Sequence, residues 1–331
     1  LGLAPAPWFP EDSLAVGKLI GWVLSLAFPA KPVLAALAAD PALRPLLPPD
    51  LAAATCILGG RPPDGSAELD RLARAALGLA GTGVGSNSWV VAGCRTASGK
   101  PILCNDPHLL FGLPAFWHPV ALRTPRHRVV GVSVPGIPLV LIGRNDDLAW
   151  GFTAVMADDG DYYRETLDAG GRYRRDGGWH PVEPVEERFG VRGGREVRRM
   201  LRFVRHGGVL CPLLPGREQG TAVSYRWTGL EPWPGLDAIV GMNRARTVGE
   251  FERALQAYAL PAQNVLVADR AGSIAYFCAG RFPRRGPGCA GAPLLEGARP
   301  EHAWQGYLDW AEHPRAVNPA AGLLVTANNR V

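Results

Sequence analysis

The feature that most constrains the fold of this chain is a change of pattern near Ser86. Before Ser86 the sequence is helix-like or rich in Ala, Pro and Gly. After it, short runs of alternating apolar and polar residues are separated by turn residues. Runs of antiparallel strands with a few helices indicate a layered α+β sandwich. The 41 Gly and 31 Pro among 331 residues have no collagen period, and they suit the many turns of such a fold.

Strand-like segments extend to the end of the chain. The runs on either side of Ser98-Gly99 predict a hairpin. Further strands are predicted at 118–124, 127–134, 138–143, 148–155, 163–168, 199–204, 222–227, 264–280 and 322–328, with one helix at 247–260.

Three helices are predicted before Ser86, at 12–28, 32–39 and 68–79. The first follows two acidic residues, and Ser13 is its predicted cap. Residues 40–66 read as a loose connector.

Charge and apolar patterning exclude two classes of protein. The net charge of +5 invites a nucleic-acid interpretation, but acidic residues are mixed into the arginine-rich stretch 188–205 and no basic groove with interleaved aromatics is evident. We therefore expect a solvated surface and no nucleic-acid partner. No apolar run reaches the roughly 18 residues that a membrane span requires, so no span is expected.

Several common motifs are absent. The sequence contains no Cys-x-x-Cys pair, no His-Glu-x-x-His zinc motif and no phosphate-binding loop. Pro135 stands where a nucleophile elbow around Ser133 requires glycine. The six cysteines read as scattered thiols, with Cys278 and Cys289 as the pair to test for a bridge.

Ser86 opens a series of short motifs that follow one another in order. Alone, Gly-Ser-Asn-x-Trp is most often a turn that enters a strand. Here it is followed by Asn105-Asp106-Pro107-His108, Val134-Pro135-Gly136, Gly143-Arg144-Asn145, Trp150-Gly151-Phe152-Thr153-Ala154, Asp158-Asp159-Gly160-Asp161, Pro261-Ala262-Gln263-Asn264 and Thr326-Ala327-Asn328-Asn329.

From about Trp8 to its last residue, this series closely resembles the penicillin acylase family of N-terminal nucleophile hydrolases. The resemblance implies the αββα four-layer sandwich, here incomplete. Residues 1–40 would be the C-terminal helical part of a small α chain, 41–85 a spacer and 86–331 the N-terminal part of a large β chain. Relatives have long segments before and after the matched region, so we expect an internal fragment of a longer precursor.

The resemblance also implies how Ser86 is activated. Family members cut themselves before this serine, here between Gly85 and Ser86, which leaves an α/β heterodimer. The freed α-amine titrates near 8, so it can act as general base for the hydroxyl of its own residue. Glycine at the preceding position tolerates the strained backbone of the self-cleavage.

Other site residues follow from the same motifs. The oxyanion donors would be the side-chain amide of Asn328 and the backbone N–H of Ala154 or Val155. His108 stands where the family carries Gln or His, and it would orient the Ser86 amine or lie near the leaving group. The alternative is a histidine satisfied by a backbone carbonyl within an Asn-Asp-Pro-His turn.

An apolar acyl pocket is expected from the same resemblance. Leu109 and Ile142 match its wall, and Trp22 and Leu24 of the first helix are candidates for another side. No cofactor is expected for catalysis. Asp158, Gly160 and Asp161 match a structural calcium site of some relatives, and a solvated acidic turn remains the alternative.

The predicted function is hydrolysis of the side-chain amide of a small N-acyl substrate, such as a β-lactam or an acyl-homoserine lactone, by an autoprocessed enzyme. A periplasmic or secreted location follows from the family. The alternative function is an unprocessed relative that only binds acyl amides.

Overall fold

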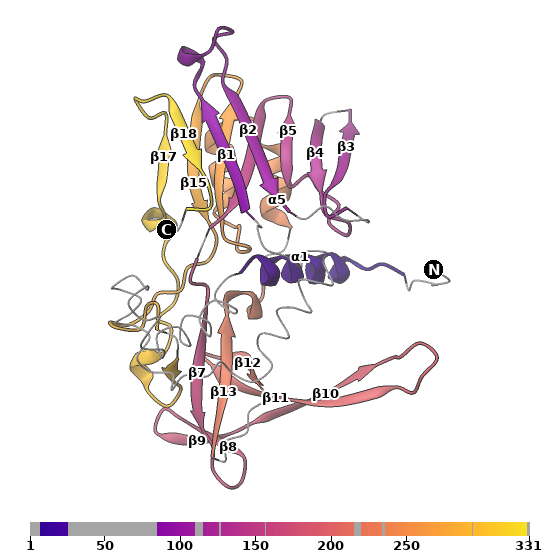
Figure 1. Cartoon of the computed structure of the whole chain (residues 1–331), viewed down its shortest axis with the longest axis vertical. Helices are drawn as coiled ribbons and strands as arrows, with labels where there is room; N and C mark the ends of the chain where they lie inside the picture. Colours follow the sequence, from indigo (N-terminus) through magenta and orange to yellow (C-terminus); the bar gives the residue numbers. More distant parts are fainter. Residues whose placement is uncertain are drawn as a thin grey trace, which may run out of the picture.

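The computed structural model describes residues 7–25, 85–109, 115–125, 127–155, 157–214, 220–233, 236–292 and 294–329. The predicted helices at 32–39 and 68–79 lie outside the described residues, and so does the connector up to residue 84. Two bodies stand one above the other, with helix α1 (Pro10–Leu24) lying across the space between them (Figure 1).

The first body is a sandwich of two antiparallel sheets. The larger has the strand order β17-β15-β14-β6-β5-β4-β3, and the smaller has the order β18-β1-β2. The strands of the larger sheet are β3 (His118–Thr124), β4 (His127–Ser133), β5 (Ile142–Asn145), β6 (Leu148–Ala154), β14 (Gln263–Asp269), β15 (Ile274–Ala279) and β17 (Arg315–Val317). Those of the smaller are β1 (Gly85–Val91), β2 (Ile102–His108) and β18 (Leu323–Thr326).

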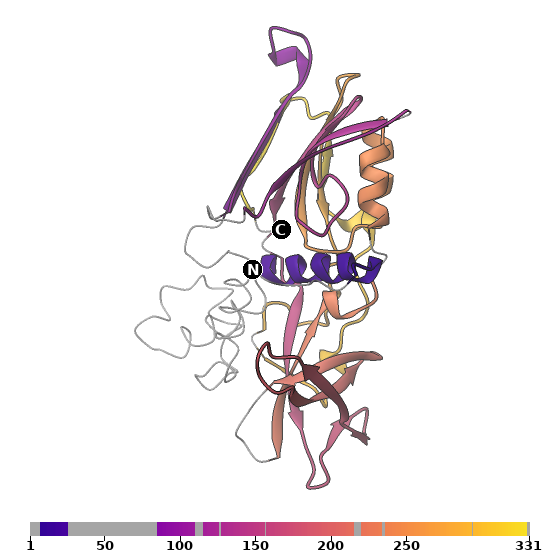
Figure 2. The same ribbon diagram turned by 90° about the vertical axis from the view of Figure 1, so that its right-hand side faces the viewer.

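Helices α5 (Asp237–Arg244) and α6 (Val248–Leu255) cover the far face of the larger sheet (Figure 2). Trp150, Phe251 and Phe277 fill the layer between helices and sheet. Val90 and Leu266 are buried between the two sheets. The described residues therefore form a helix–sheet–sheet order, three layers of the expected αββα sandwich. The outer face of the small sheet carries exposed apolar side chains, among them Trp89 at 38% and Val325 at 60% exposure.

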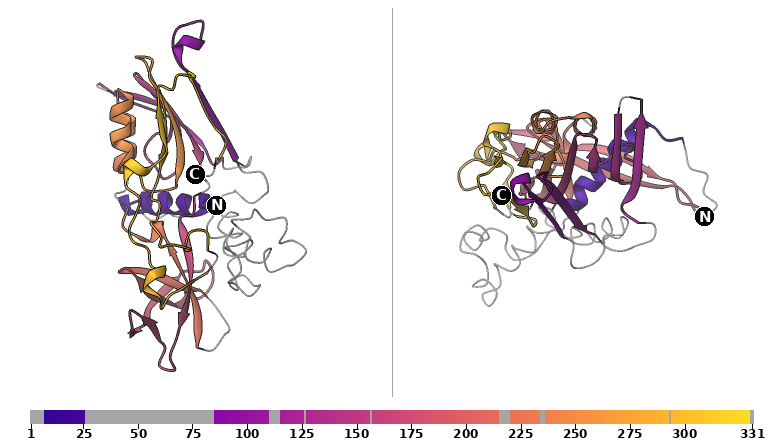
Figure 3. Two further views of the ribbon diagram at one scale, coloured as in Figure 1. Left: turned by 90° about the vertical axis from the view of Figure 1, so that its left-hand side faces the viewer. Right: turned by 90° about the horizontal axis from the view of Figure 1, so that it is seen from above.

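The second body is built on a six-stranded sheet of order β10-β11-β12-β13-β7-β16. Its strands are β7 (Gly160–Thr166), β10 (Glu183–Phe189), β11 (Val197–His206), β12 (Val209–Leu214), β13 (Thr221–Trp227) and β16 (Leu295–Glu296), and β8 (Arg172–Arg175) pairs with β9 (Gly178–Pro181) beside it. The short 3-10 turns η2 (Gly93–Arg95), η3 (Thr228–Leu230), η4 (Pro300–His302) and η5 (Trp310–Glu312) complete the described elements. Seen from the side, this sheet lies on the opposite side of α1 from the sandwich (Figure 3).

A buried polar cluster fixes the centre of the second sheet. Glu165 is fully buried and accepts hydrogen bonds from Arg175 and from the hydroxyl of Ser224, the latter at 2.7 Å. Its Oε1 also lies 2.7 Å from Nε2 of His206. Burial lowers the pKa of His206, which favours the neutral imidazole beside Arg175.

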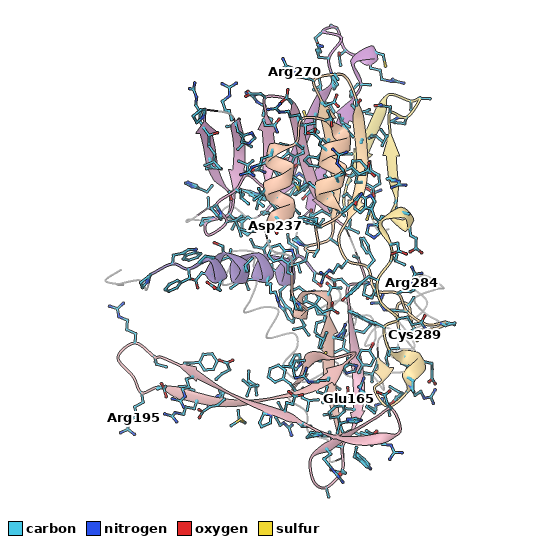
Figure 4. The ribbon with its side chains drawn as sticks, turned by 180° about the vertical axis from the view of Figure 1, so that it is seen from behind. Glu165, Arg195, Asp237, Arg270, Arg284 and Cys289 are labelled. Carbon is cyan, nitrogen blue, oxygen red and sulfur yellow. The ribbon has the colours of Figure 1, made fainter. Side chains whose placement is uncertain are left out.

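The arginine-rich stretch forms an extended hairpin of β10 and β11, with Arg195 at its tip (Figure 4). Along it Arg205 pairs with Glu183, and Arg198 pairs with Glu186 and Glu196. Alternating cations and carboxylates leave no uniformly basic surface on this hairpin, as the mixed sequence pattern indicates.

Most predicted strands are confirmed, including the hairpin around Ser98-Gly99 and the strands at 118–124 and 148–154. The first helix begins earlier than predicted, and its N-cap is Phe9 instead of Ser13. The helix at 247–260 ends at Leu255, and Thr247 caps it by accepting the N–H of Glu250.

The cysteine test pair does not form a bridge. Cys278 and Cys289 are both free, and they belong to different apolar clusters. Among the described residues, no helix is long and apolar enough to cross a membrane.

Candidate active site

Ser86 lies at the start of β1, at the end of the sandwich that faces α1. Its strand partner is Pro107 of β2, and Gly85 stands opposite His108. On the other side of β1, β18 ends at Thr326, and Asn328 follows in the left-handed conformation with φ of 59°. Asparagine is one of the few residues that adopt this conformation readily, and the turn directs its side chain back toward Ser86.

The Asn328 side-chain amide joins two functional groups of the site. Its Oδ1 accepts the backbone N–H of Ser86 at 2.5 Å, and its Nδ2 donates to the carbonyl of Ala154 at 2.9 Å. These residues are 242 and 174 positions away in sequence. One amide therefore sets the distance between the start of β1 and the end of β6.

The end of β6 has one edge paired with a strand and the other edge held by side chains. Val155 donates its N–H to the carbonyl of Ala262 at 3.1 Å. Because alternate residues of a strand face opposite neighbours, the N–H of Ala154 points away from β14, toward Asn328 and the pocket. Val155 therefore does not fit the predicted oxyanion role, and Ala154 is the donor that remains of that pair.

Asn105 holds the same free edge of β6 at Phe152, two residues before Ala154. Its Oδ1 accepts the N–H of Phe152 at 3.0 Å, and its Nδ2 donates to the carbonyl of Phe152 at 2.9 Å. The same Nδ2 also lies 2.9 Å from the carbonyl of Asn87. The sequence places Asn105 in the Asn-Asp-Pro-His motif without indicating its role. Its position in the Asn-Asp-Pro-His motif was the available signal.

A buried network supports the residues behind Asn328. Asn264 is fully buried, accepts the hydroxyl of Tyr276 at 2.8 Å and donates to Oγ1 of Thr153 at 3.2 Å. Thr153 in turn donates to Oγ1 of Thr326 at 3.0 Å. Asn264 also reaches the carbonyl of Asn329 at 3.5 Å. The network ties β6, β14 and β18 together behind the site, with Thr153 next to Ala154 and Thr326 two residues before Asn328.

His108 lies opposite Gly85, beside the predicted cleavage bond, and the alternative of a histidine satisfied within a turn is wrong. It is the last residue of β2, so the Asn-Asp-Pro-His motif forms a strand and not a turn. Its Nε2 lies 2.8 Å from Oδ2 of Asp106, a carboxylate instead of a backbone carbonyl, and 3.5 Å from Nδ2 of Asn87. The ring is thus held beside Gly85, on the strand that faces the predicted cleavage bond.

An apolar pocket opens beside Ser86 and Ala154. Leu24, Leu109 and Ile142 line it, as predicted for its wall. Further lining residues, to which the sequence assigns no pocket role, are Gly17, Ile20, Pro107, Phe116, Trp117, Val134, Ile137, Leu141, Phe152, Trp233, Leu236, Ile239, Tyr258, Leu260, Pro261 and Gln263. The chemistry of this lining suits a hydrocarbon group placed next to the serine.

Trp22 lies on the wrong side of α1 for the predicted role. Its ring packs edge-on against Tyr225 and Trp227, with centroid distances of 5.8 and 5.3 Å, in the second body. At 100° per residue, Ile20 and Leu24 share one face of the helix, and Trp22 lies roughly opposite. Ile20 is therefore the pocket residue at this point, with Gly17 on the same face.

The acidic turn after β6 is neither solvated nor arranged for calcium. Asp161 is fully buried, and its Oδ2 accepts Nε of Arg285 at 2.7 Å. Asp158 also contacts Arg285. Calcium takes six to eight oxygen ligands, but no cluster of three or more His, Cys, Asp or Glu placed for a metal occurs in the described part of the chain. Asp158, Gly160 and Asp161 therefore do not fit the ion, and no step of the chemistry is assigned to one.

Comparisons with known proteins identify relatives of this chain. The family model described as penicillin amidase matches residues 1–331. The acyl-homoserine lactone acylase QuiP of Pseudomonas fluorescens is 34% identical over 351 residues, covering 100% of this chain and 42% of that protein. The penicillin acylase 2 proenzyme of a Pseudomonas species is 33% identical, covering 100% of this chain and 44% of that protein.

A solved structure gives the same result for the fold. The penicillin G acylase from Alcaligenes faecalis superimposes with a TM-score of 0.65 and 27% sequence identity, covering 74% of this chain and 44% of that one. The chain spans less than half the length of these relatives.

The sheet order, the three described layers and the likeness to the solved acylase place the chain in the fold class of the N-terminal nucleophile hydrolases, as the resemblance implies. Within that class, the chain belongs to the penicillin amidase family.

Proposed function

We propose that the protein hydrolyses the side-chain amide of an N-acyl substrate, with Ser86 as nucleophile after self-cleavage of the Gly85–Ser86 bond. The observation that carries this proposal is the position of Asn328. Its Oδ1 accepts the N–H of Ser86, and its Nδ2 donates to the carbonyl of Ala154 at the end of β6. Ser86 and Ala154 both line one apolar pocket.

Maturation would use the serine against its own preceding peptide bond. The Ser86 hydroxyl adds to the Gly85 carbonyl, and the C–N bond breaks as the nitrogen takes up a proton. Gly85 is then held as an ester on the serine oxygen. Water hydrolyses that ester, which gives a Gly85 carboxylate on one chain and a free Ser86 amine and hydroxyl on the other. The name of the relative from the Pseudomonas species, a proenzyme, supports this sequence of events.

Turnover would repeat the same chemistry on a bound amide. The Ser86 α-amine takes the hydroxyl proton as the oxygen attacks the substrate carbonyl, and it returns that proton to the departing amine. An acyl ester remains on Ser86. Water then attacks with the α-amine again as base, and the carboxylic acid is released. The hydrogen bond from the Ser86 nitrogen to Asn328 would orient the lone pair of this base.

The negative charge of the tetrahedral intermediate requires hydrogen-bond donors already in place. The backbone N–H of Ala154 and the side-chain Nδ2 of Asn328 are candidate donors at the end of β6. In the structure Nδ2 donates to the Ala154 carbonyl at 2.9 Å, which places this donor at the same residue whose N–H is the second candidate. Each such donor is worth roughly 3 kcal/mol of transition-state stabilisation.

Substrate class follows from the lining of the pocket. The acyl side is an apolar group, because hydrocarbon side chains from α1, the loop after β2 and the loop before β5 surround it. β-Lactams with apolar side chains and acyl-homoserine lactones both satisfy this requirement, and relatives named for each are found. We also infer an α/β heterodimer after cleavage and a periplasmic or secreted location, both from family membership.

Intact-mass measurement on the purified full-length protein tests the proposal. We expect two chains whose masses place the cut between Gly85 and Ser86, and a single uncut chain for Ser86→Ala. A panel of N-acyl amides with varied acyl length then measures turnover of the processed protein. An uncut protein that binds acyl amides without turnover, with unchanged binding in Ser86→Ala, would instead favour a binding-only relative.

A further inference from the structure

Arg285 supplies a buried cation to the acidic turn between β6 and β7. Its side chain is 8% exposed, and Nε donates to Oδ2 of Asp161 at 2.7 Å. Nη2 donates to the backbone carbonyl of Asp158 at 2.9 Å and lies 3.3 Å from Oδ1 of the same residue. One guanidinium group therefore contacts two carboxylates and one carbonyl, which are the kinds of oxygen that a calcium ion would bind.

Further contacts of these carboxylates come from hydrogen-bond donors. The Gly291 N–H donates to Oδ2 of Asp158 at 3.2 Å, and Nε1 of Trp304 donates to Oδ2 of Asp161 at 2.5 Å. The Gly291 N–H and Trp304 Nε1 therefore lie beside these carboxylates, where a calcium site would have further oxygen ligands. The Trp304 ring also faces two guanidinium groups, with its centroid 4.6 Å from Arg226 and 5.7 Å from Arg285.

The positive charge at this turn belongs to a side chain, the Arg285 guanidinium, and not to a bound ion. A buried carboxylate such as Asp161 requires a paired positive charge. The arginine guanidinium stays protonated at all accessible pH values and presents a planar set of donors that matches carboxylate geometry. Because it is part of the chain, a chelator cannot remove it.

We propose that Arg285 performs the structural task that calcium performs in some relatives, so that the folded protein needs no divalent cation to hold this turn. The turn starts at Val155, directly after Ala154 of the candidate oxyanion site. Its stability therefore fixes the end of β6. The proposal concerns folding, so it does not depend on the reaction that the site catalyses.

The test compares thermal unfolding of the full-length protein in 5 mM CaCl2 and in 5 mM EDTA at matched ionic strength. The wild-type Tm is expected to agree within about 1 °C between the two, and metal analysis is expected to find far less than one calcium per chain. A stoichiometric calcium ion, or a Tm that falls in EDTA, overturns the proposal.

Variants separate a cation substitute from an ordinary ion pair. Arg285→Ala is expected to lower Tm by about 5 to 10 °C, because it leaves buried carboxylates unpaired. Added CaCl2 should restore part of this loss, whereas MgCl2 at the same concentration should restore less. The matched control is Arg284→Ala, which removes a surface arginine paired with Glu312 and should change Tm by less than about 2 °C.

Each result of the variants decides the proposal. Calcium rescue of Arg285→Ala supports it, and a folded Arg285→Ala with no calcium response overturns it. If Arg285→Ala does not fold, the wild-type comparison in CaCl2 and EDTA still gives the answer.

Discussion

Asn105 and Phe152 exchange two hydrogen bonds, in the pattern that two backbone residues of neighbouring strands would use. The side-chain oxygen of Asn105 accepts the Phe152 N–H at 3.0 Å, and the side-chain nitrogen donates to the Phe152 carbonyl at 2.9 Å. An amide side chain thus completes the edge of β6 where β5 no longer pairs with it. Ala154 lies two residues further on and faces the same side.

Asn105→Ala is expected to lower kcat of the processed protein about tenfold or more, with a smaller change in KM. The substitution leaves both polar groups of Phe152 without a partner and releases the strand that carries the Ala154 N–H. Steady-state kinetics on an N-acyl amide measure the effect. The control is Asn318→Ala, which removes another amide-to-backbone hydrogen bond far from the site and should lower Tm alone. Equal kcat in both variants would contradict the role assigned to Asn105.

Asn328→Ala is expected to reduce kcat by about a hundredfold to a thousandfold and to slow self-cleavage by a similar factor. The substitution removes the donor proposed for the oxyanion and the acceptor of the Ser86 nitrogen. Rates of precursor loss by mass spectrometry and of turnover by product formation provide the two readouts. Asn329→Ala, whose side chain only accepts the Ala327 N–H, serves as the neighbouring control. An active Asn328→Ala would require a different oxyanion donor.

Asp159 predicts how stability changes with pH. Burial raises the pKa of this carboxyl to about 6, against the hydrogen bonds from Ser25 and Trp227 that favour its charged form. The unfolded group titrates near 3.8, so the folded state holds the proton more tightly. Its contribution to stability is fully present below pH 3.8 and is lost as pH rises through 6, by an amount on the order of 3 kcal/mol.

Asp159→Asn should therefore raise the free energy of unfolding at pH 7.5 and change it little at pH 4. Urea unfolding at the two pH values measures the difference, with Asp146→Asn as an exposed control. A larger gain at pH 4 than at pH 7.5 would reverse the sign of the prediction.

Ile20 and Trp22 should respond differently to substitution. Ile20→Phe places extra volume in the pocket and should lower kcat/KM for long or branched acyl groups at least tenfold more than for acetyl. Trp22→Phe should lower Tm by a few degrees through lost contact with Trp227 and leave the acyl preference unchanged. A panel of acyl lengths measures both. A change of acyl preference in Trp22→Phe but not in Ile20→Phe would show that Trp22, and not Ile20, contacts the acyl group.

The α+β class and the family could be predicted from the sequence, because period-two runs and ordered motifs are local features. Trp22 shows where such reasoning fails. Helical spacing predicts that Trp22 and Ile20 lie on different faces, but it does not indicate which face meets the pocket until the second body is placed. The role of Asn105 and the Arg285 ion pairs were missed for a related reason. Their partners are 47 and 124 positions away, and no periodicity reports such contacts.

Helix α1 packs against both bodies of the structure, with one face at the acyl pocket and the other on the second sheet. Gly17 and Gly21 leave so little space that an added Cβ would stand 2.5 Å from Trp233 and 2.2 Å from Leu260, so the helix is wedged against the pocket side. Its opposite face is pinned by Trp22 to the aromatic residues of the second sheet. The second body thereby helps to hold α1 in position at the acyl pocket. Tyr225 and Trp227 do not line the pocket, yet their contacts with Trp22 support the helix that forms one of its walls.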